Sequence, residues 1–227
     1  QTLEQWGEDL DRALALKGPD GALVEHLSAY ALTYEPNTAM TARMRRGEFD
    51  PATDELEAGM YLHAVERLRT AGFDRYEVSN FARGRDAESR HNLAYWRNDD
   101  WLAAGPSAAA HVAGHRWKNV PRLTDWMEGV TTSGGDSPII EHEPPDPVRA
   151  LQERLMMGLR IAEGLPADEV LAEAERIGAE ERLQAAVRRE WHGGLLELAE
   201  GRWRLTDDGF LQADGIAGRL MRAVSTG

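Results

Sequence analysis

The sequence predicts an α/β fold in the first part of the chain and a helical module closed by a β-hairpin in the second part. Two short apolar runs flank a long amphipathic helical pattern, which is the strand, helix, strand order of a parallel sheet. Residues 131–147, rich in Gly and Pro, then interrupt regular structure. We therefore expect a first module at 1–133, a linker at 134–146 and a second module at 147–227.

The chain opens with an amphipathic helix. Thr2 and Gln5 stand at capping-box spacing, and apolar residues recur at helical intervals until Gly18-Pro19. A second helix can begin after Asp50-Pro51 and ends before Gly72.

Two strands are expected on either side of the second helix, at 27–34 (LSAYALTY) and 76–81 (YEVSNF). Apolar and aromatic runs of this length are typical of strands that are covered on both faces of a parallel sheet. Parallel sheets place ligand groups at the carboxyl ends of their strands. We therefore expect functional residues near Thr33 and Asn80.

The second module begins with three helical patterns, followed by two strand-like pieces and a last helix; these lie at about 147–163, 166–177, 179–192, 195–198, 203–206 and from 208 onward. Three helices followed by a hairpin is the order of a winged-helix module, and Thr206-Asp207-Asp208-Gly209 resembles the turn found after such wings. Residues 146–227 carry 11 basic and 15 acidic side chains, a net charge of −4, which disfavours a DNA partner.

Composition excludes several classes of protein. The net charge of −13 argues against general attraction to nucleic acid, and the absence of Cys removes disulfides, thiolate metal sites and thiol nucleophiles. The sequence lacks both a long apolar run and the pattern of a secretion signal. We expect a cytoplasmic protein, which can be peripheral at the inner face of the membrane. A first residue that is not Met suggests a piece of a longer protein.

The densest group of polar and aromatic residues follows the second expected strand; its members are Arg83, Arg85, Arg90, His91, Asn92, Tyr95, Trp96 and Arg97. Imidazole is a ligand for haem iron, guanidinium pairs with carboxylates such as porphyrin propionates, and aromatic rings can flank a macrocycle. The pattern therefore fits an anionic tetrapyrrole. From these residues alone, the more common explanation is a histidine that simply hydrogen-bonds within a packed loop, beside arginines that offset nearby acids.

A second candidate is the small-residue stretch 103–111 (AAGPSAAAH), where Gly105 would let a ligand approach the backbone. Small residues where a helix packs on a sheet give the same pattern. The remaining histidines show no metal-ligand spacing, and Glu141 and Glu143 are expected on the solvated surface of the linker.

Several of these stretches resemble the HemW-like branch of the radical-SAM, oxygen-independent coproporphyrinogen dehydrogenase family. The resemblance rests on QTLEQW, HLSAYALTYEPNT, YEVSNFAR, RHNLAYW and AAGPSA, which begin at residues 1, 26, 76, 90 and 103. The HNxxYW motif is specific to the haem-chaperone branch. The resemblance implies that the first module is the second half of a partial (β/α) barrel, followed by a winged-helix-like domain.

The resemblance also implies cofactors. In the family, three thiolates of a CxxxCxxC motif hold a [4Fe–4S] cluster that coordinates S-adenosylmethionine. This chain has no Cys, so we expect it to be catalytically inactive by itself. We interpret it as the C-terminal part of a longer protein.

Residue roles follow by position. The resemblance makes His91 the haem-binding residue, with Asn92, Tyr95 and Trp96 shaping its loop, and Arg83, Arg90 and Arg97 as candidate partners of the propionates. Thr33 and Ala109 match positions that line the S-adenosylmethionine pocket, with Gly105 beside them. Three positions depart from the family pattern: Ala109 where His is frequent, Asn37 where a turn usually has Gly, and Ser89 where relatives often have Cys.

Three functions remain open at this point. The leading hypothesis is a haem chaperone that delivers haem to haem-requiring respiratory enzymes. The alternatives are an oxygen-independent coproporphyrinogen III oxidase and a winged-helix interaction module. Exposed sheet edges would offer a route to dimers.

Overall fold

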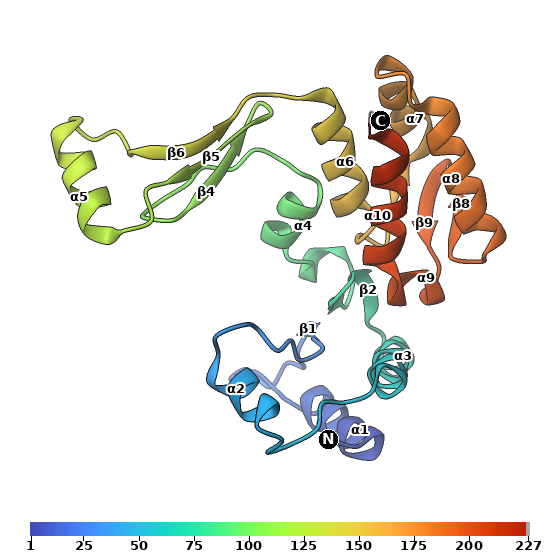
Figure 1. Ribbon diagram of the computed structural model, residues 1–227. Helices are drawn as coiled ribbons and strands as arrows, with labels where there is room; N and C mark the ends of the chain where they lie inside the picture. Colours follow the sequence, from blue (N-terminus) through green and yellow to red (C-terminus); the bar gives the residue numbers. More distant parts are fainter. Residues whose placement is uncertain (226–227) are drawn as a thin grey trace. The chain divides into compact units, whose positions relative to one another are not determined.

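The computed structural model describes residues 1–225, which fall into two compact units, 1–88 and 89 to the C-terminus (Figure 1). Each unit is described by itself. The compact units divide at residue 88, which is not one of the expected boundaries. The expected boundaries at 133 and 147 stay a prediction.

The first unit is built on three α-helices, α1 Leu3–Leu14, α2 Ala39–Arg45 and α3 Asp54–Thr70, with a short 3-10 helix at Arg85–Ala87. The predicted capping box is confirmed, since the Thr2 hydroxyl accepts from the Gln5 backbone and the Gln5 side chain accepts from the Thr2 backbone. α1 packs on α3 around Leu10 and Leu68, and the Trp6 indole donates to the Met60 carbonyl at 2.9 Å.

The sheet of the first unit has the order β1-β3-β2, with strands β1 His26–Ser28, β2 Asp74–Glu77 and β3 Asn80–Ala82. Both neighbouring pairs are antiparallel, so the expected parallel pairing of 27–34 with 76–81 is wrong. The second expected strand folds back at the turn Val78-Ser79, and the first stops at Ser28. The Asn80 side chain, expected to bind a ligand, instead accepts from Ser28 and donates to the buried Glu77 carboxylate.

The second unit begins with helix α4, Arg90–Trp96, and a three-stranded antiparallel sheet of β4 Ala109–Val112, β5 His115–Asn119 and β6 Ile139–Glu143. Helix α5, Leu123–Thr132, lies between β5 and β6 in the chain (Figure 1). Strand β6 lies within the segment that was expected to be an irregular linker. Its flanking residues Pro138 and Pro144 lie outside the strand, where the lack of a backbone N–H costs no ladder hydrogen bond.

The C-terminal part contains α6 Pro147–Gly158, β7 Leu165–Pro166, α7 Ala167–Arg176, α8 Glu180–His192, β8 Leu196–Ala199, β9 Arg202–Leu205, α9 Asp207–Leu211 and α10 Ala213–Val224. Apart from the short strand β7 and the division of the last helix into α9 and α10, this is the order expected from the sequence. The strands pair in the order β7-β9-β8, and α10 packs against both α6 and α8. Its core consists of buried aliphatic side chains such as Leu155, Leu183, Ile216 and Leu220. Three helices and an antiparallel hairpin confirm the winged-helix-like prediction.

The turn after β9 explains the predicted Thr-x-x-Gly pattern. Thr206 caps α9 by accepting from the Gly209 backbone at 3.0 Å, and its hydroxyl donates to the Gly194 carbonyl at 2.8 Å. A Cβ atom at Gly209 would lie 2.0 Å from the Leu195 carbonyl oxygen. Only glycine therefore fits this close approach of two backbone segments.

Candidate functional site

Helix α4 carries the HNxxYW motif. Ser89 begins the helix, with its hydroxyl accepting from the Asn92 backbone N–H at 3.3 Å. Helical spacing places His91 and Tyr95 on one face, one turn apart, and Asn92 and Trp96 on the adjacent face.

The His91 ring is exposed and contacts the ring of Tyr95 edge-on, with centroids 5.0 Å apart. Within residues 1–225, neither ring nitrogen of His91 makes a hydrogen bond or an ion pair. The imidazole is therefore accessible and has free ligand capacity, unlike a structural histidine whose nitrogens are satisfied by the fold.

Three further rings continue from His91 within the second unit. Tyr95 contacts Trp101 at a centroid distance of 4.8 Å, and Trp101 contacts His111 at 5.0 Å. The Trp101 indole donates to the Ala109 carbonyl at 3.1 Å, and its backbone pairs with His111. These contacts fix Trp101, against which Tyr95 packs, while His91 lies at the exposed end of the series.

His111 is the structural histidine of this series. It is 7% exposed, and its Nδ1 lies 3.1 Å from the carbonyl oxygen of Asp99. Because a carbonyl only accepts, Nδ1 carries the proton in this hydrogen bond. Sequence reasoning did not single out His111 or Trp101, since their bridge joins a loop to β4.

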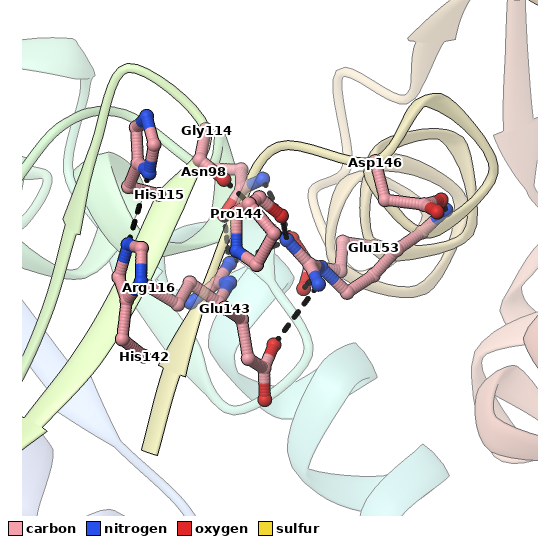
Figure 2. Close-up of polar contacts among 10 residues, drawn as sticks. Asn98, Gly114, His115, Arg116, His142, Glu143, Pro144, Asp146 and Glu153 are labelled. Carbon is pink, nitrogen blue, oxygen red and sulfur yellow. Dashed lines mark hydrogen bonds and ion pairs between the residues drawn. The ribbon is translucent and has the colours of Figure 1, made fainter. Parts of the chain in front are cut away.

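A polar network connects the end of α4 with β5 and α6 (Figure 2). The Arg116 guanidinium donates to the Asn98 side chain at 2.6 Å and to the Glu153 carboxylate at 2.8 Å. Asn98 also donates to Glu153 at 3.3 Å, and the Arg149 Nε lies 3.7 Å from the same carboxylate. Arg116 also lies over the Trp101 ring, 5.2 Å from its centroid. The network therefore fixes the position of Arg116, which packs on the Trp101 ring of the aromatic series.

The three candidate propionate partners are in different situations. Arg83 lies in the first unit, where its guanidinium donates to the Val24 and Ala71 carbonyls and stacks over Phe73. Arg97 pairs with Glu163 at 3.3 Å. Arg90 is exposed, and in the described part of the chain it has no acidic partner. Arg90 is thus the candidate whose charge is most available to a ligand.

Trp96 and Arg97 face a different part of the second unit from His91. They line a cavity of about 810 Å³ together with residues of α6 and α7, and the Arg160 guanidinium lies 5.8 Å from the Trp96 ring centroid. The four motif residues therefore do not form a single patch: His91 and Tyr95 share one surface, and Trp96 lies on another.

The residues expected near S-adenosylmethionine are spread over both units. Thr33 is exposed in the segment between β1 and α2 of the first unit. Gly105 precedes β4, takes φ +89° and accepts from the Asn119 side chain at 2.8 Å. Ala109 is the exposed first residue of β4. If Gly105 carried a Cβ atom, no atom other than those of its neighbours in the chain would lie within 4 Å of it. A ligand can therefore approach the backbone at Gly105.

The structure brings together two histidines that the sequence did not connect. His115 Nδ1 and His142 Nε2 lie 3.1 Å apart, and the two rings stack with centroids separated by 5.3 Å (Figure 2). Their proximity follows from the pairing of β5 with β6, which the linker expectation had hidden. Over residues 1–225, no group of three or more His, Cys, Asp or Glu side chains is arranged to hold a metal ion.

Comparison with known proteins agrees with the fold. Residues 146–211 match the family described as HemN C-terminal domain. The heme chaperone HemW of Mycobacterium tuberculosis is 37% identical over 199 residues, which cover 87% of this chain and 48% of the relative. This chain is therefore similar to HemW over about half of that relative's length.

Other relatives extend the same result. The mitochondrial radical S-adenosyl methionine domain-containing protein 1 of Danio rerio is 30% identical over 218 residues, covering 92% of this chain and 45% of the relative. Coproporphyrinogen III oxidase HemN of Escherichia coli, a radical SAM enzyme, matches with a TM-score of 0.69 at 16% identity, covering 97% of this chain and 52% of that one. This last likeness shows a shared fold.

The HemW-like chain spans about half the length of the curated relatives that it matches. Its fold matches that of HemN over the shared part, whereas the division into a partial barrel at 1–133 and a C-terminal domain stays a prediction. The radical SAM relatives imply S-adenosylmethionine and an iron–sulfur cluster in the longer proteins. With no Cys among its 227 residues, this chain does not offer thiolate ligands for such a cluster.

Helices long and apolar enough to cross a membrane are absent from the described residues.

Proposed function

We propose that this chain carries the haem-binding surface of a haem chaperone, with the His91 imidazole as the ligand of the haem iron. The observation that supports this most is the exposed His91 ring, whose nitrogens are free in the described structure while its orientation is set by Tyr95. Neutral imidazole nitrogen is a common axial ligand of haem iron. Relatives named as heme chaperones agree with the proposal.

The neighbouring residues have distinct proposed roles. Tyr95 presents its ring beside the imidazole and thereby limits the orientations that His91 can adopt. Arg90 is adjacent in sequence and exposed, so its guanidinium can pair with a propionate of the bound haem. Asn92 and Trp96, on the adjacent face of α4, would contact the haem only at its edge.

Arg83 and Arg97 are weaker propionate partners in this proposal. Arg83 would have to give up its carbonyl contacts, and Arg97 its ion pair with Glu163. For S-adenosylmethionine, we propose contacts with Gly105 and Ala109 of the second unit, supported by the open backbone at Gly105, and Thr33 of the first unit stays a prediction from the sequence. When bound, that cofactor would supply radical chemistry that this chain does not itself support.

Haem titration of the 227-residue chain tests the His91 assignment. We expect the Soret band of wild-type protein to shift as haem binds, and His91→Ala to lower the affinity by about tenfold or more, which corresponds to about 1.4 kcal/mol. His192→Ala is the matched control, because His192 is also exposed and lies at the end of a helix in the same unit. Identical spectra and affinities for wild type and His91→Ala would remove the assignment.

The recipients follow from the same proposal. A haem chaperone delivers its cargo to haem-requiring proteins, and we propose respiratory enzymes at the inner face of the membrane, reached from the cytoplasm. Transfer of haem from the loaded chain to an apo-form respiratory enzyme, with His91→Ala as the control, tests this step. The proposal also allows dimers through exposed sheet edges, which sedimentation analysis would detect.

A further inference from the structure

A shallow cavity of about 390 Å³ lies between α8 and α10, at a distance in sequence from every haem-site residue. Its wall contains four arginines, Arg182, Arg189, Arg219 and Arg222, and its other lining residues are alanines. The lining includes no acidic side chain. An arginine-lined concavity is unexpected in a chain whose net charge is −13.

One of the four guanidinium charges is neutralised within the fold. Arg219 makes two hydrogen bonds to the Glu190 carboxylate, at 2.7 and 2.8 Å, and Glu190 is buried. This bidentate pair holds α10 against α8 and fixes one wall of the cavity.

The other three arginines have no carboxylate partner among the described residues. The Arg182 Nε donates only to the Ala223 carbonyl, at 2.9 Å, and Arg189 and Arg222 are exposed. Side chains three and four positions apart are neighbours on a helix. At these distances from Arg182 and Arg189 the sequence has only Ala, Gly and His, so no acidic side chain of α8 is placed to pair with either arginine.

Several arginines elsewhere in the same unit behave differently. Arg154, Arg160 and Arg204 each form an ion pair, with Glu169 and Glu173, with Asp214 and with Glu200. Arg90, Arg176 and Arg188 also lack a carboxylate partner among the described residues, but none of them lines the α8–α10 cavity, where three such charges lie together. We call the part of the cavity lined by Arg182, Arg189 and Arg222 the arginine groove.

We propose that the arginine groove docks an acidic segment of a protein partner. Arg182 and Arg189 are seven residues apart on α8, which separates their Cα atoms by about 10 Å along the helix axis. Cationic groups spread over this length suit a chain of carboxylates better than one small anion. Guanidinium groups form planar, bidentate pairs with carboxylates and are more weakly hydrated than ammonium groups.

The charge of the surroundings favours a protein over a nucleic acid. Residues 146–227 carry a net charge of −4, so a long polyanion that extends beyond the groove meets acidic surface. A short acidic segment needs only the three local cations. This surface lies on α8 and α10, whereas the proposed haem ligand lies on α4, so the two proposals can fail independently.

Fluorescence anisotropy of a labelled short peptide of alternating Glu and Gly, titrated with the full 227-residue chain, tests the proposal. We expect binding at about 50 mM salt that weakens strongly at about 300 mM. The double variant Arg189→Glu, Arg222→Glu should lose affinity by about tenfold or more, or about 1.4 kcal/mol. Arg189→Lys, Arg222→Lys keeps the positive charge but loses the bidentate geometry, so its affinity should lie between those of the wild type and the double Glu variant.

Arg188→Glu is the matched control, since Arg188 is exposed on the same helix but does not line the cavity. Its affinity for the peptide should stay within about twofold of wild type. Far-UV circular dichroism establishes that each variant is folded. The proposal fails if the double variant binds as wild type does, or if Arg188→Glu loses as much. It also fails if inorganic phosphate or a short DNA duplex displaces the peptide at equal charge concentration.

Discussion

The imidazole of His91 lies edge-on to the phenol ring of Tyr95, with ring centroids 5.0 Å apart and planes inclined by 71°. Tyr95 is in turn packed against Trp101, whose backbone and indole are both hydrogen-bonded. The orientation of an exposed side chain is therefore set by a neighbour that the fold holds in place. Tyr95 is therefore a positioning residue, because it would act on bound haem only through the His91 ring. Its contribution can be separated from that of the His91 imidazole.

Replacement of Tyr95 tests this positioning role. An edge-to-face aromatic pair contributes about 0.5–1.5 kcal/mol, so Tyr95→Ala should weaken haem binding by about two- to tenfold. Tyr95→Phe keeps the ring and should bind haem within about twofold of wild type. Soret titration gives both affinities, and the Soret position of bound haem reports whether His91 still ligates. A large loss in Tyr95→Phe would show that the hydroxyl, and not the ring contact, matters.

Removal of the Glu153 carboxylate is expected to lower the stability of the fold strongly. It accepts from Arg116 and Asn98, and the Nε of Arg116 is already buried without a partner in the described structure. Glu153→Ala leaves Arg116 with less compensation, and we expect the free energy of unfolding to fall by about 2–3 kcal/mol. Urea denaturation followed by circular dichroism measures this change.

The control for Glu153 is an exposed ion pair of the same unit. Glu200 pairs with Arg204, but its side chain is 80% exposed, so Glu200→Ala should change stability by at most about 0.5–1 kcal/mol. Equal losses in the two variants would contradict a special role for the network shown in Figure 2.

Gly209 provides a test of the turn after β9. Gly209→Ala places a Cβ 2.0 Å from the Leu195 carbonyl oxygen, so the backbone must shift, and we expect a loss of about 2–3 kcal/mol. Gly218 in α10 is the contrasting position, because only the flexible end of Arg222 is near its Cβ, at 3.4 Å. Gly218→Ala should stabilise the helix by up to about 1 kcal/mol. Thermal unfolding resolves the opposite signs.

Local sequence signals predicted α1, α3 and the helices of the C-terminal part, because capping and helical periodicity act within a few residues, but they did not predict α2, α4 or α5. The Thr2 and Gln5 capping box and the helices of the C-terminal part are confirmed. Strand pairing depends on distant partners, so it was predicted poorly. A two-residue turn at Val78-Ser79 converts one expected strand into a hairpin, and β6 forms where flanking prolines suggested a linker.

The same distinction applies to the candidate site. The HNxxYW motif was expected in a loop, but the structure shows helix α4, whose spacing brings His91 beside Tyr95. The support from Trp101, the separation of Trp96 and the carbonyl contacts of Arg83 depend on tertiary packing, which no local pattern encodes. The haem and S-adenosylmethionine assignments therefore stay predictions until ligands are titrated.

The segment after α2 gives a prediction for pH. Arg43 and Arg46 both donate to the Glu48 carboxylate, and these hydrogen bonds, that of Arg43 foremost, hold the pKa of Glu48 below its usual value. A carboxyl group with a lowered folded-state pKa stabilises the fold above its unfolded pKa, and this contribution is lost as the pH falls through the lowered value. The contacts of Glu48 should therefore persist at neutral pH and disappear under acid conditions.

Carboxyl-detected NMR titration measures this directly. Arg43→Ala should raise the pKa of Glu48 more than Arg46→Ala does, because the Arg43 hydrogen bond has the larger influence. Glu48→Gln, which cannot titrate, should remove the corresponding step from the pH dependence of the backbone signals after α2. An unchanged Glu48 pKa in both arginine variants would mean that the exposed pairs are screened by solvent and do not order this segment.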